Sequence, residues 1–357
     1  MANLYISVFC VCICLCVISC FILCLCSSGF LYVRSKPPIA LLLDENEHYQ
    51  VQSKEINKSQ YNNYIRGYES GHINSSEIKY KELPDNKSAI LWIHGFNDYY
   101  FHFHIGEELL NEGYNMYTIT LPNYPQKNVD RKYLFYIDDL KKYFSYIDQF
   151  IEFIRARGIN IIVLYGHSTG GLISTAYLHE GKKAHHIDKL ILNAPFFDFH
   201  DSNIMEIIIK NVLTNIGKIL PKFVIREGKN QLSSPEKYKD ILSRYYFDQN
   251  RKITYPNHTF AGWINAVATY HQKIQKKQIK LDIPILVLMS STSKNTCKGE
   301  QNGDCVLDVT EIKKYSRNLG KHVIIKEYNG AIHDVLLSKS TVVNDALYDI
   351  IGFLRDS

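Results

Sequence analysis

The 357-residue sequence has little excess charge, and it has few cysteines beyond its first 26 residues. Its formal net charge is +5, and its one conspicuous basic run, at 271–280, alternates with isoleucine and glutamine like a solvated helix face. The sequence thus lacks the basic patch of a nucleic-acid-binding protein, and we expect no nucleic-acid partner. Seven of the nine cysteines lie within residues 1–26, at spacings that match no zinc site. No carboxylate completes a site around His102 and His104, so we expect neither a metal nor an organic cofactor.

Charged side chains are also absent from residues 1–33, where the stretch from Leu4 to Leu25 is almost wholly apolar. A stretch of this length can cross a bilayer as a helix. The first positive charges, on Arg34 and Lys36, follow it, whereas a cleaved signal peptide has them in front. We expect an uncleaved anchor at 1–33 and a juxtamembrane linker at 34–60. The positive-inside rule favours a cytoplasmic catalytic part, with a lumenal or extracellular one as the alternative.

The most informative stretch of the chain is 161–171. The β-branched run from Ile161 to Tyr165 predicts a buried strand, and Leu172 to Leu178 predicts a helix that packs back on the sheet. Between them, Ser168 lies at the centre of G-x-S-x-G, the pattern of a nucleophile elbow. Gly166 and Gly170 would remove the clashes that a strained serine backbone otherwise meets.

Strands and helices alternate through most of the chain. Buried strands are expected at 89–93, 115–121, 161–165, 187–192, 283–289 and 323–325, antiparallel strands at 61–80, and helices at 102–113, 134–157, 172–178 and 309–319. This rhythm predicts an α/β fold with a mostly parallel central sheet flanked by helices. It is interrupted at 199–281, where we expect helices at 204–220 and 263–270. We interpret this stretch as a helical cap inserted between the core parts 61–198 and 282–357.

Two further motifs follow core strands. His94-Gly95 ends the strand at 89–93, and Gly95 would let the N–H groups of Phe96 and Thr169 point at a tetrahedral oxyanion. Gly330-Ala-Ile-His333-Asp334 follows the strand at 323–325. A serine, an acid near residue 304 and a histidine thus occur in the chain order of a Ser…Asp…His triad.

With these three motifs, the sequence resembles the α/β-hydrolase superfamily, and more closely its monoacylglycerol lipase, lysophospholipase and serine-aminopeptidase-like group. The resemblance covers roughly residues 61–357. It implies that Ser168 is the nucleophile, that His333 is the general base and that an aspartate orients the imidazole. Asp304 fits the position of the acid in this group better than the second choice, Asp308, which would begin the next helix as its N-cap.

The anchor and the resemblance imply a membrane-anchored serine hydrolase. We expect it to cleave carboxylic esters of single-chain lipids, such as monoacylglycerol or lysophospholipid, through an acyl-enzyme. One alternative is an aminopeptidase-like enzyme, in which Glu206 or Glu227 would bind the substrate amine. Another is a catalytically silent scaffold with the same fold. Cys297 and Cys305 bracket an insertion in the acid loop; they would pair in an oxidising compartment and be free thiols in the cytoplasm.

Overall fold

A computed structural model of the protein describes residues 62, 68–73, 76–83, 85–126, 129–199, 213–226, 244–248, 251–252, 258–297 and 302–356. The expected anchor at 1–33 and linker at 34–60 lie outside these ranges. So do residues 204–212 of the expected cap helix. Within the described ranges, no helix combines the length and the apolar character that crossing a bilayer requires.

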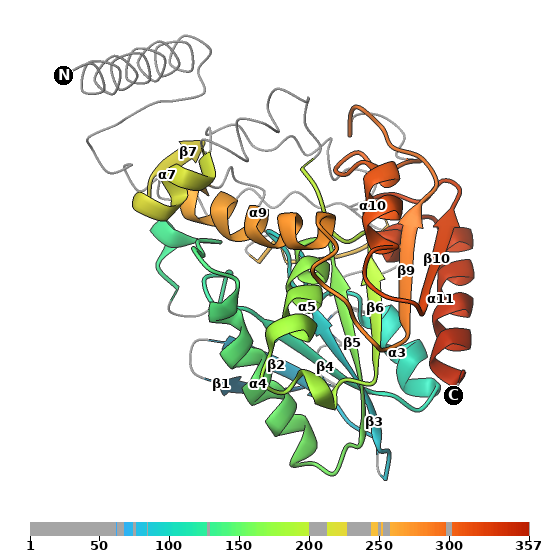
Figure 1. Cartoon of the computed structure of the whole chain (residues 1–357). Coiled ribbons are helices and arrows are strands. Elements are labelled where there is room, and N and C mark those ends of the chain that lie inside the picture. Colours follow the sequence, from blue (N-terminus) through green and yellow to red (C-terminus); the bar gives the residue numbers. More distant parts are fainter. Residues whose placement is uncertain are drawn as a thin grey trace, which may run out of the picture.

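The centre of the molecule is one sheet of eight strands in the order β1-β2-β4-β3-β5-β6-β9-β10 (Figure 1). The strands are β1 (Glu69–Ile73), β2 (Ser76–Lys81), β3 (Ser88–Ile93), β4 (Asn115–Thr120), β5 (Ile161–His167), β6 (Lys189–Asn193), β9 (Ile285–Ser290) and β10 (Val323–Tyr328). From β4 to β10 in this order all neighbours are parallel, whereas β1 and β2 join one edge antiparallel. The predicted mostly parallel central sheet is therefore confirmed.

Helices cover both faces of the sheet, which explains why its central strands are apolar on both sides. The helices of the core are α3 (Phe103–Asn111), α4 (Lys141–Arg155), α5 (Thr169–Glu180), α10 (Val309–Ser316) and α11 (Ser340–Arg355), with short 3₁₀ turns η1 (Arg131–Tyr133), η2 (Ala184–His186) and η4 (Val335–Leu337). Along β3, Leu91 and Ile93 pack in the cluster that includes α4 and α5. Ile90 and Trp92 pack in the cluster that includes α3 and α11. This alternation is the two-residue period of a strand buried on both faces.

The helix expected at 134–157 begins only at Lys141, so that prediction was wrong for its first seven residues. Phe135 has a φ of 61°, which a right-handed helix does not allow. Asp139 then accepts a hydrogen bond from the N–H of Lys141 at 2.9 Å, at the start of α4. Phe135 and Ile137 are nevertheless buried, because the loop packs them against the core. The apolar pattern correctly indicated burial there, but not helix.

The chain between β6 and β9 holds helices α7 (Thr214–Ile219) and α9 (Ala261–Gln275) and a separate two-stranded antiparallel sheet of β7 (Val224–Arg226) and β8 (Thr259–Phe260). Helix α9 crosses above the carboxyl ends of the central strands (Figure 1). His271 of α9 bonds through Nε2 to the carbonyl oxygen of Phe196, just after β6, at 2.9 Å. This contact places α9 directly over the edge of the sheet where parallel strands end.

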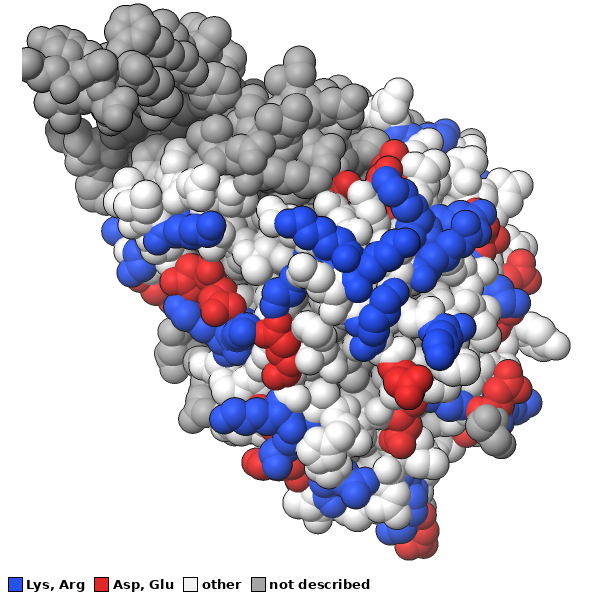
Figure 2. Space-filling view, viewed as in Figure 1, with Lys and Arg blue, Asp and Glu red and all other residues white. Residues whose placement is uncertain are grey.

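Lysine and arginine side chains gather over the end of α9 and over α10 (Figure 2). Exposed basic residues in this part of the chain are Lys276, Lys277, Lys280, Lys314 and Arg317. The basic run at 271–280 divides accordingly: His271 and Ile274 are buried, and the lysines after them face solvent. The run therefore behaves as the solvated end of a packed helix.

Candidate active site

The turn between β5 and α5 holds Ser168 in a strained conformation. Its φ of 52° and ψ of −118° lie in a region that L-residues with side chains rarely adopt. Two glycines allow the tight approach of β5 to α5. A Cβ at Gly166 would lie 2.6 Å from the carbonyl oxygen of Gly170, and one at Gly170 would lie 2.4 Å from those of Ile93 and His94. No larger residue fits at either position while this turn is kept.

Three side chains meet at the carboxyl ends of the parallel strands. Atom Nε2 of His333 lies 3.0 Å from Oγ of Ser168. On the other side of the ring, Nδ1 of His333 lies 2.8 Å from Oδ2 of Asp304. A carboxylate can only accept, so Nδ1–H donates to Asp304 and Nε2 is left to accept from the serine hydroxyl. Asp304 follows β9 and His333 follows β10, which brings residues far apart in the sequence to the serine.

The structure distinguishes between the two candidate acids. Asp304 is fully buried, and its Oδ1 accepts hydrogen bonds from the N–H groups of Val306 and Leu307 at 2.8 and 2.9 Å. Burial opposes its negative charge, but the electrostatic attraction of His333 and the hydrogen bonds that Asp304 accepts outweigh that effect and lower the pKa of Asp304 below its usual value. Asp308 instead caps α10, accepting from the N–H of Thr310 at 2.8 Å. Asp304 is therefore the partner of His333.

The two N–H groups expected to bind an oxyanion lie beside the serine. Thr169 is the first residue of α5, and the first N–H groups of a helix have no partner within it. Gly95, which precedes Phe96, lies against the elbow: a Cβ there would be 3.3 Å from Cβ of Ser168. In the described part of the chain, neither N–H donates a hydrogen bond. Both remain free for an anionic oxygen.

His94 fixes the loop that carries Phe96, a role that sequence reasoning did not assign. Its Nδ1 lies 2.9 Å from the carbonyl oxygen of Gly95, and its Nε2 accepts from the N–H of Leu121 at 3.2 Å. His94 is almost completely buried, and burial lowers its pKa to about 4. The ring is therefore neutral at physiological pH, as an accepting Nε2 requires.

Aromatic rings form a packed cluster next to this loop. The ring of Phe96 lies 5.0 Å from Phe135 and 5.0 Å from Trp263 of α9, between ring centroids. The ring centroid of Trp263 lies 6.3 Å from that of Phe196, and the centroid of Phe196 lies 5.3 Å from that of Phe199. This aromatic cluster thus extends from the Phe96 loop to α9 and to the chain after β6.

A disulfide lies next to the buried acid. Cys297 and Cys305 are joined, with their Cα atoms 5.2 Å apart. Cys305 directly follows Asp304, whose N–H donates to the carbonyl oxygen of Thr292 at 2.8 Å and whose carbonyl oxygen accepts from Lys294 at 2.6 Å. The covalent link and these two bonds all restrain the loop that carries the acid.

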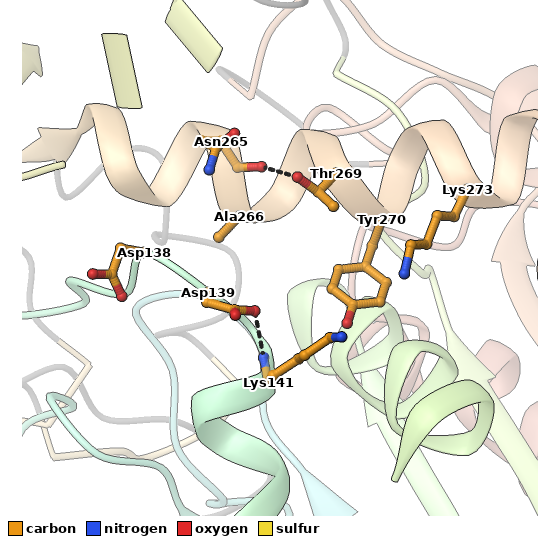
Figure 3. Close-up of a pocket in the computed structure, with 8 residues that line it drawn as sticks. All are labelled: Asp138, Asp139, Lys141, Asn265, Ala266, Thr269, Tyr270 and Lys273. Carbon is orange, nitrogen blue, oxygen red and sulfur yellow. Dashed lines mark hydrogen bonds between the residues drawn. The ribbon is translucent and has the colours of Figure 1, made fainter. Parts of the chain in front are cut away.

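A polar cavity of about 290 Å³ lies apart from these residues, between the start of α4 and α9 (Figure 3). It is lined by Asp138, Asp139, Lys141, Asn265, Ala266, Thr269, Tyr270 and Lys273. Lys141 and Lys273 both pair with Glu180, and Asp138 pairs with Lys142. Ser168, His333 and Asp304 are not among the residues that line this cavity.

Of the two histidines considered above as metal ligands, His102 is buried and His104 is half-buried. Nε2 of His102 lies 2.8 Å from Oδ2 of Asp334. Burial lowers the pKa of His104 to about 3, and its ring stacks on Tyr245 with centroids 5.0 Å apart. No group of three or more potential metal ligands occurs among the residues that the structure describes.

The strand order, the serine elbow and the helices on both faces define an α/β-hydrolase, a serine hydrolase in class. The chain belongs to the serine aminopeptidase family, S33, whose sequence model matches residues 84–340. A comparison with curated protein sequences finds no match.

Solved structures with the same fold include lipases and esterases. A soluble variant of monoglyceride lipase from Saccharomyces cerevisiae, in complex with a substrate analogue, aligns with a TM-score of 0.60 and 18% identity over 80% of this chain and 94% of its own. The monoacylglycerol lipase of Paleococcus ferrophilus gives 0.59 and 16% over 78% and 97%. A carboxyl esterase from Bacillus coagulans, in complex with glycerol, gives 0.56 and 14% over 80% and 97%.

The buried His94 predicts a specific pH dependence of stability. Its pKa is about 4 in the folded protein and 6.5 for the free side chain, so the unfolded chain binds the proton more readily. Stability is therefore lost as pH falls below 6.5, by about 2 kcal/mol at pH 5. In urea unfolding, we expect the stability difference between wild type and His94→Gln to narrow by that amount from pH 7 to pH 5. A difference that stays constant would show that His94 does not carry the effect.

Proposed function

We propose that the protein is a serine hydrolase that cleaves carboxylic esters of single-chain lipids such as monoacylglycerol or lysophospholipid. The observation that carries the proposal is the hydrogen-bonded chain from Ser168 through His333 to Asp304. It is the arrangement that activates a serine hydroxyl as a nucleophile.

In this mechanism, Nε2 of His333 takes the proton of Ser168 as Oγ attacks the ester carbonyl carbon. Asp304 keeps the proton on Nδ1 and stabilises the imidazolium that forms. The N–H groups of Phe96 and Thr169 bind the oxyanion, each contributing about 3–4 kcal/mol to the transition state. His333 then gives its proton to the leaving alcohol. Water, activated by the same ring, hydrolyses the acyl-enzyme and releases the fatty acid.

Two observations support an acyl chain as part of the substrate. The rings of Phe135 and Trp263 flank Phe96, whose N–H would hold the carbonyl oxygen, so apolar side chains lie next to the position proposed for the reacting carbonyl. Two of the structures with the same fold are named monoacylglycerol or monoglyceride lipases. An alkyl chain in contact with the partly exposed rings of Phe96 and Trp263 would be stabilised by about 0.8 kcal/mol per buried methylene group.

The family name supports a second candidate, an aminopeptidase. Such an enzyme needs an acidic group to bind the substrate's amine. The candidates Glu206 and Glu227 both lie outside the described residues. The rings that contact Phe96 supply no carboxylate for that amine, and we therefore place the lipid ester first.

We further propose that residues 4–25 anchor the enzyme in a membrane and that the tip of α7 touches the bilayer. Ile219 is 78% exposed and Leu220 is 57% exposed. The exposed side chains of Lys218 and Lys222 lie on either side of them in the sequence. Apolar side chains flanked by cations suit an anionic membrane surface.

We propose that the catalytic domain faces the cytoplasm, because Arg34 and Lys36 follow the apolar stretch and positive charges favour the cytoplasmic side of a membrane. The pairing of Cys297 with Cys305 is the observation against it, because disulfides are rare in the cytosol.

The triad is tested by labelling the full chain in detergent with a fluorophosphonate probe. We expect wild type to label, Ser168→Ala and His333→Ala not to label, and Asp304→Asn to lose about 10⁴-fold in kcat through the wrong imidazole tautomer. Asp308→Asn is the matched control and should keep full activity. Monoacyl esters and aminoacyl amides then separate lipase from peptidase. A folded wild-type protein that fails to label would contradict the hydrolase proposal and favour the catalytically silent scaffold.

The membrane contact is tested by comparing a lipid ester in anionic vesicles with a soluble short-chain ester. The double variant Ile219→Ser, Leu220→Ser should lose about tenfold on vesicles, since two apolar side chains no longer insert. Its rate on the soluble ester should stay unchanged. Ile324→Ser removes another exposed apolar side chain, 45% exposed on β10, and serves as control. An equal loss in both variants would contradict a specific contact.

The orientation is tested by the state of the two cysteines in cells. If the domain is cytoplasmic, Cys297 and Cys305 react with a thiol-blocking reagent added before any reductant. Blocking only after reduction would show a disulfide and place the domain in an oxidising compartment.

A further inference from the structure

A buried polar cluster lies directly behind the serine and the histidine of the site. Its members are His102, His167, Asn193 and Asp334, none of them more than 6% exposed. His167 precedes Ser168 in the chain, and Asp334 follows His333. Two of the three loops that meet at the site therefore each send a neighbouring residue into one cluster.

Asn193, the last residue of β6, is bonded to both loops. Its carbonyl oxygen accepts from the N–H of Ser168 at 2.9 Å and from Nδ1 of His167 at 3.0 Å. Its side-chain Oδ1 accepts from the N–H of Val335 at 3.2 Å, and its Nδ2 donates to Oδ1 of Asp334 at 2.7 Å. The backbone of Asn193 thus holds the serine, and its side chain holds the residues that follow the catalytic histidine.

Asp334 uses both carboxylate oxygens. Oδ1 accepts from Asn193 and, at 3.1 Å, from the N–H of Leu336, while Oδ2 accepts from Nε2–H of His102 at 2.8 Å. Burial opposes its charge, but His167 and His102 outweigh that effect and hold the pKa of Asp334 well below its usual value. A charged, fully hydrogen-bonded side chain is therefore fixed next to the peptide bond of His333.

The chain on the other side of His333 is restrained as well. The N–H of Ile332 donates to Oγ of Ser338 at 3.0 Å, and Oγ of Ser290, at the end of β9, donates to the carbonyl oxygen of Ala331 at 2.8 Å. The histidine backbone is thus fixed from both directions. Of these restraints, the bonds of the Asn193 side chain to Asp334 and to the N–H of Val335 also connect directly to the strand end that holds Ser168.

We propose that Asn193 and Asp334 are positioning residues, which through their shared hydrogen bond keep Nε2 of His333 within reach of Ser168 Oγ. The proposal rests on the function proposed above. Loss of the bond lets the histidine loop shift relative to the elbow, and a displacement of about 1 Å can cost about 100-fold in rate.

Steady-state kinetics and probe labelling of the full chain test the proposal. We expect Asn193→Ala and Asp334→Ala each to lower kcat about 30-fold with KM within about twofold, because the change concerns the proton transfer and not substrate binding. The labelling rate of Ser168 should fall in parallel. Asn193→Ser and Asp334→Ser, which keep a polar group, replace the alanine variants if those fail to fold.

Asp334→Asn separates geometry from charge. Its amide oxygen can still accept from Asn193 and Leu336. Nδ1 of His102 has no hydrogen-bond partner among the described residues, so that ring can carry its proton there and accept from the new amide at Nε2. We therefore expect kcat to stay within about threefold of wild type.

A double-mutant cycle shows whether the two residues act as one unit. The variant with both alanines should lose no more than about 30-fold to 100-fold, whereas independent effects would multiply to about 1,000-fold. Tyr177→Phe is the control: it removes a 2.6 Å bond from Tyr177 to Asp148, away from the site. It should lower the melting temperature and leave kcat unchanged.

The possible results separate the two proposals. A wild type that labels and turns over, with folded alanine variants of near-normal kcat, would overturn the positioning role and leave the hydrolase proposal intact. Multiplicative losses in the double variant would also overturn it. A folded wild type that does not label would overturn both.

Discussion

The geometry of the site depends on one steric constraint, which is that α5 begins directly over the end of β3 with no side chain between them. A Cβ at Gly170 would lie 2.4 Å from the carbonyl oxygens of Ile93 and His94. The same close packing brings the loop that carries Phe96 against the serine elbow. A single contact between backbones therefore places both the nucleophile and the donors that would bind the oxyanion. It also holds the unfavourable backbone conformation of Ser168.

The parallel sheet brings the remaining site residues together, because its strands end at a common edge. β5, β9 and β10 lead into the serine, the acid and the histidine, while the end of β6 supplies Asn193 between them. Ligands of open α/β sheets bind at this edge for the same topological reason. The residues that flank the reacting groups point inward and bond to one another. The edge thus has a reactive outer layer and a buried polar layer that supports it.

The fold and the serine elbow could be predicted from the sequence, because the strand–helix alternation and the turn from Gly166 to Gly170 are local and visible in the residue types. Asp304 was assigned from the family resemblance. The supporting role of Asn193 and Asp334 could not be predicted from the sequence. Asn193 looked like the end of a strand, since its partner Asp334 is 141 residues away. Helix periodicity misled at residues 134–140, where a loop buries its apolar side chains without being helical. Helix α11 at Ser340–Arg355 had no chemical motif and was not predicted.

The strained backbone of Ser168 also bears on how a newly made chain acquires reactivity. Its conformation is unfavourable by about 1–3 kcal/mol and persists only while surrounding structure enforces it. That structure includes β3 and β6, which pair with β5 on its two sides. Because β6 follows the serine in the chain, a growing polypeptide that ends soon after α5 carries an ordinary hydroxyl. The strained conformation of the serine therefore forms only once the sheet has assembled around the turn.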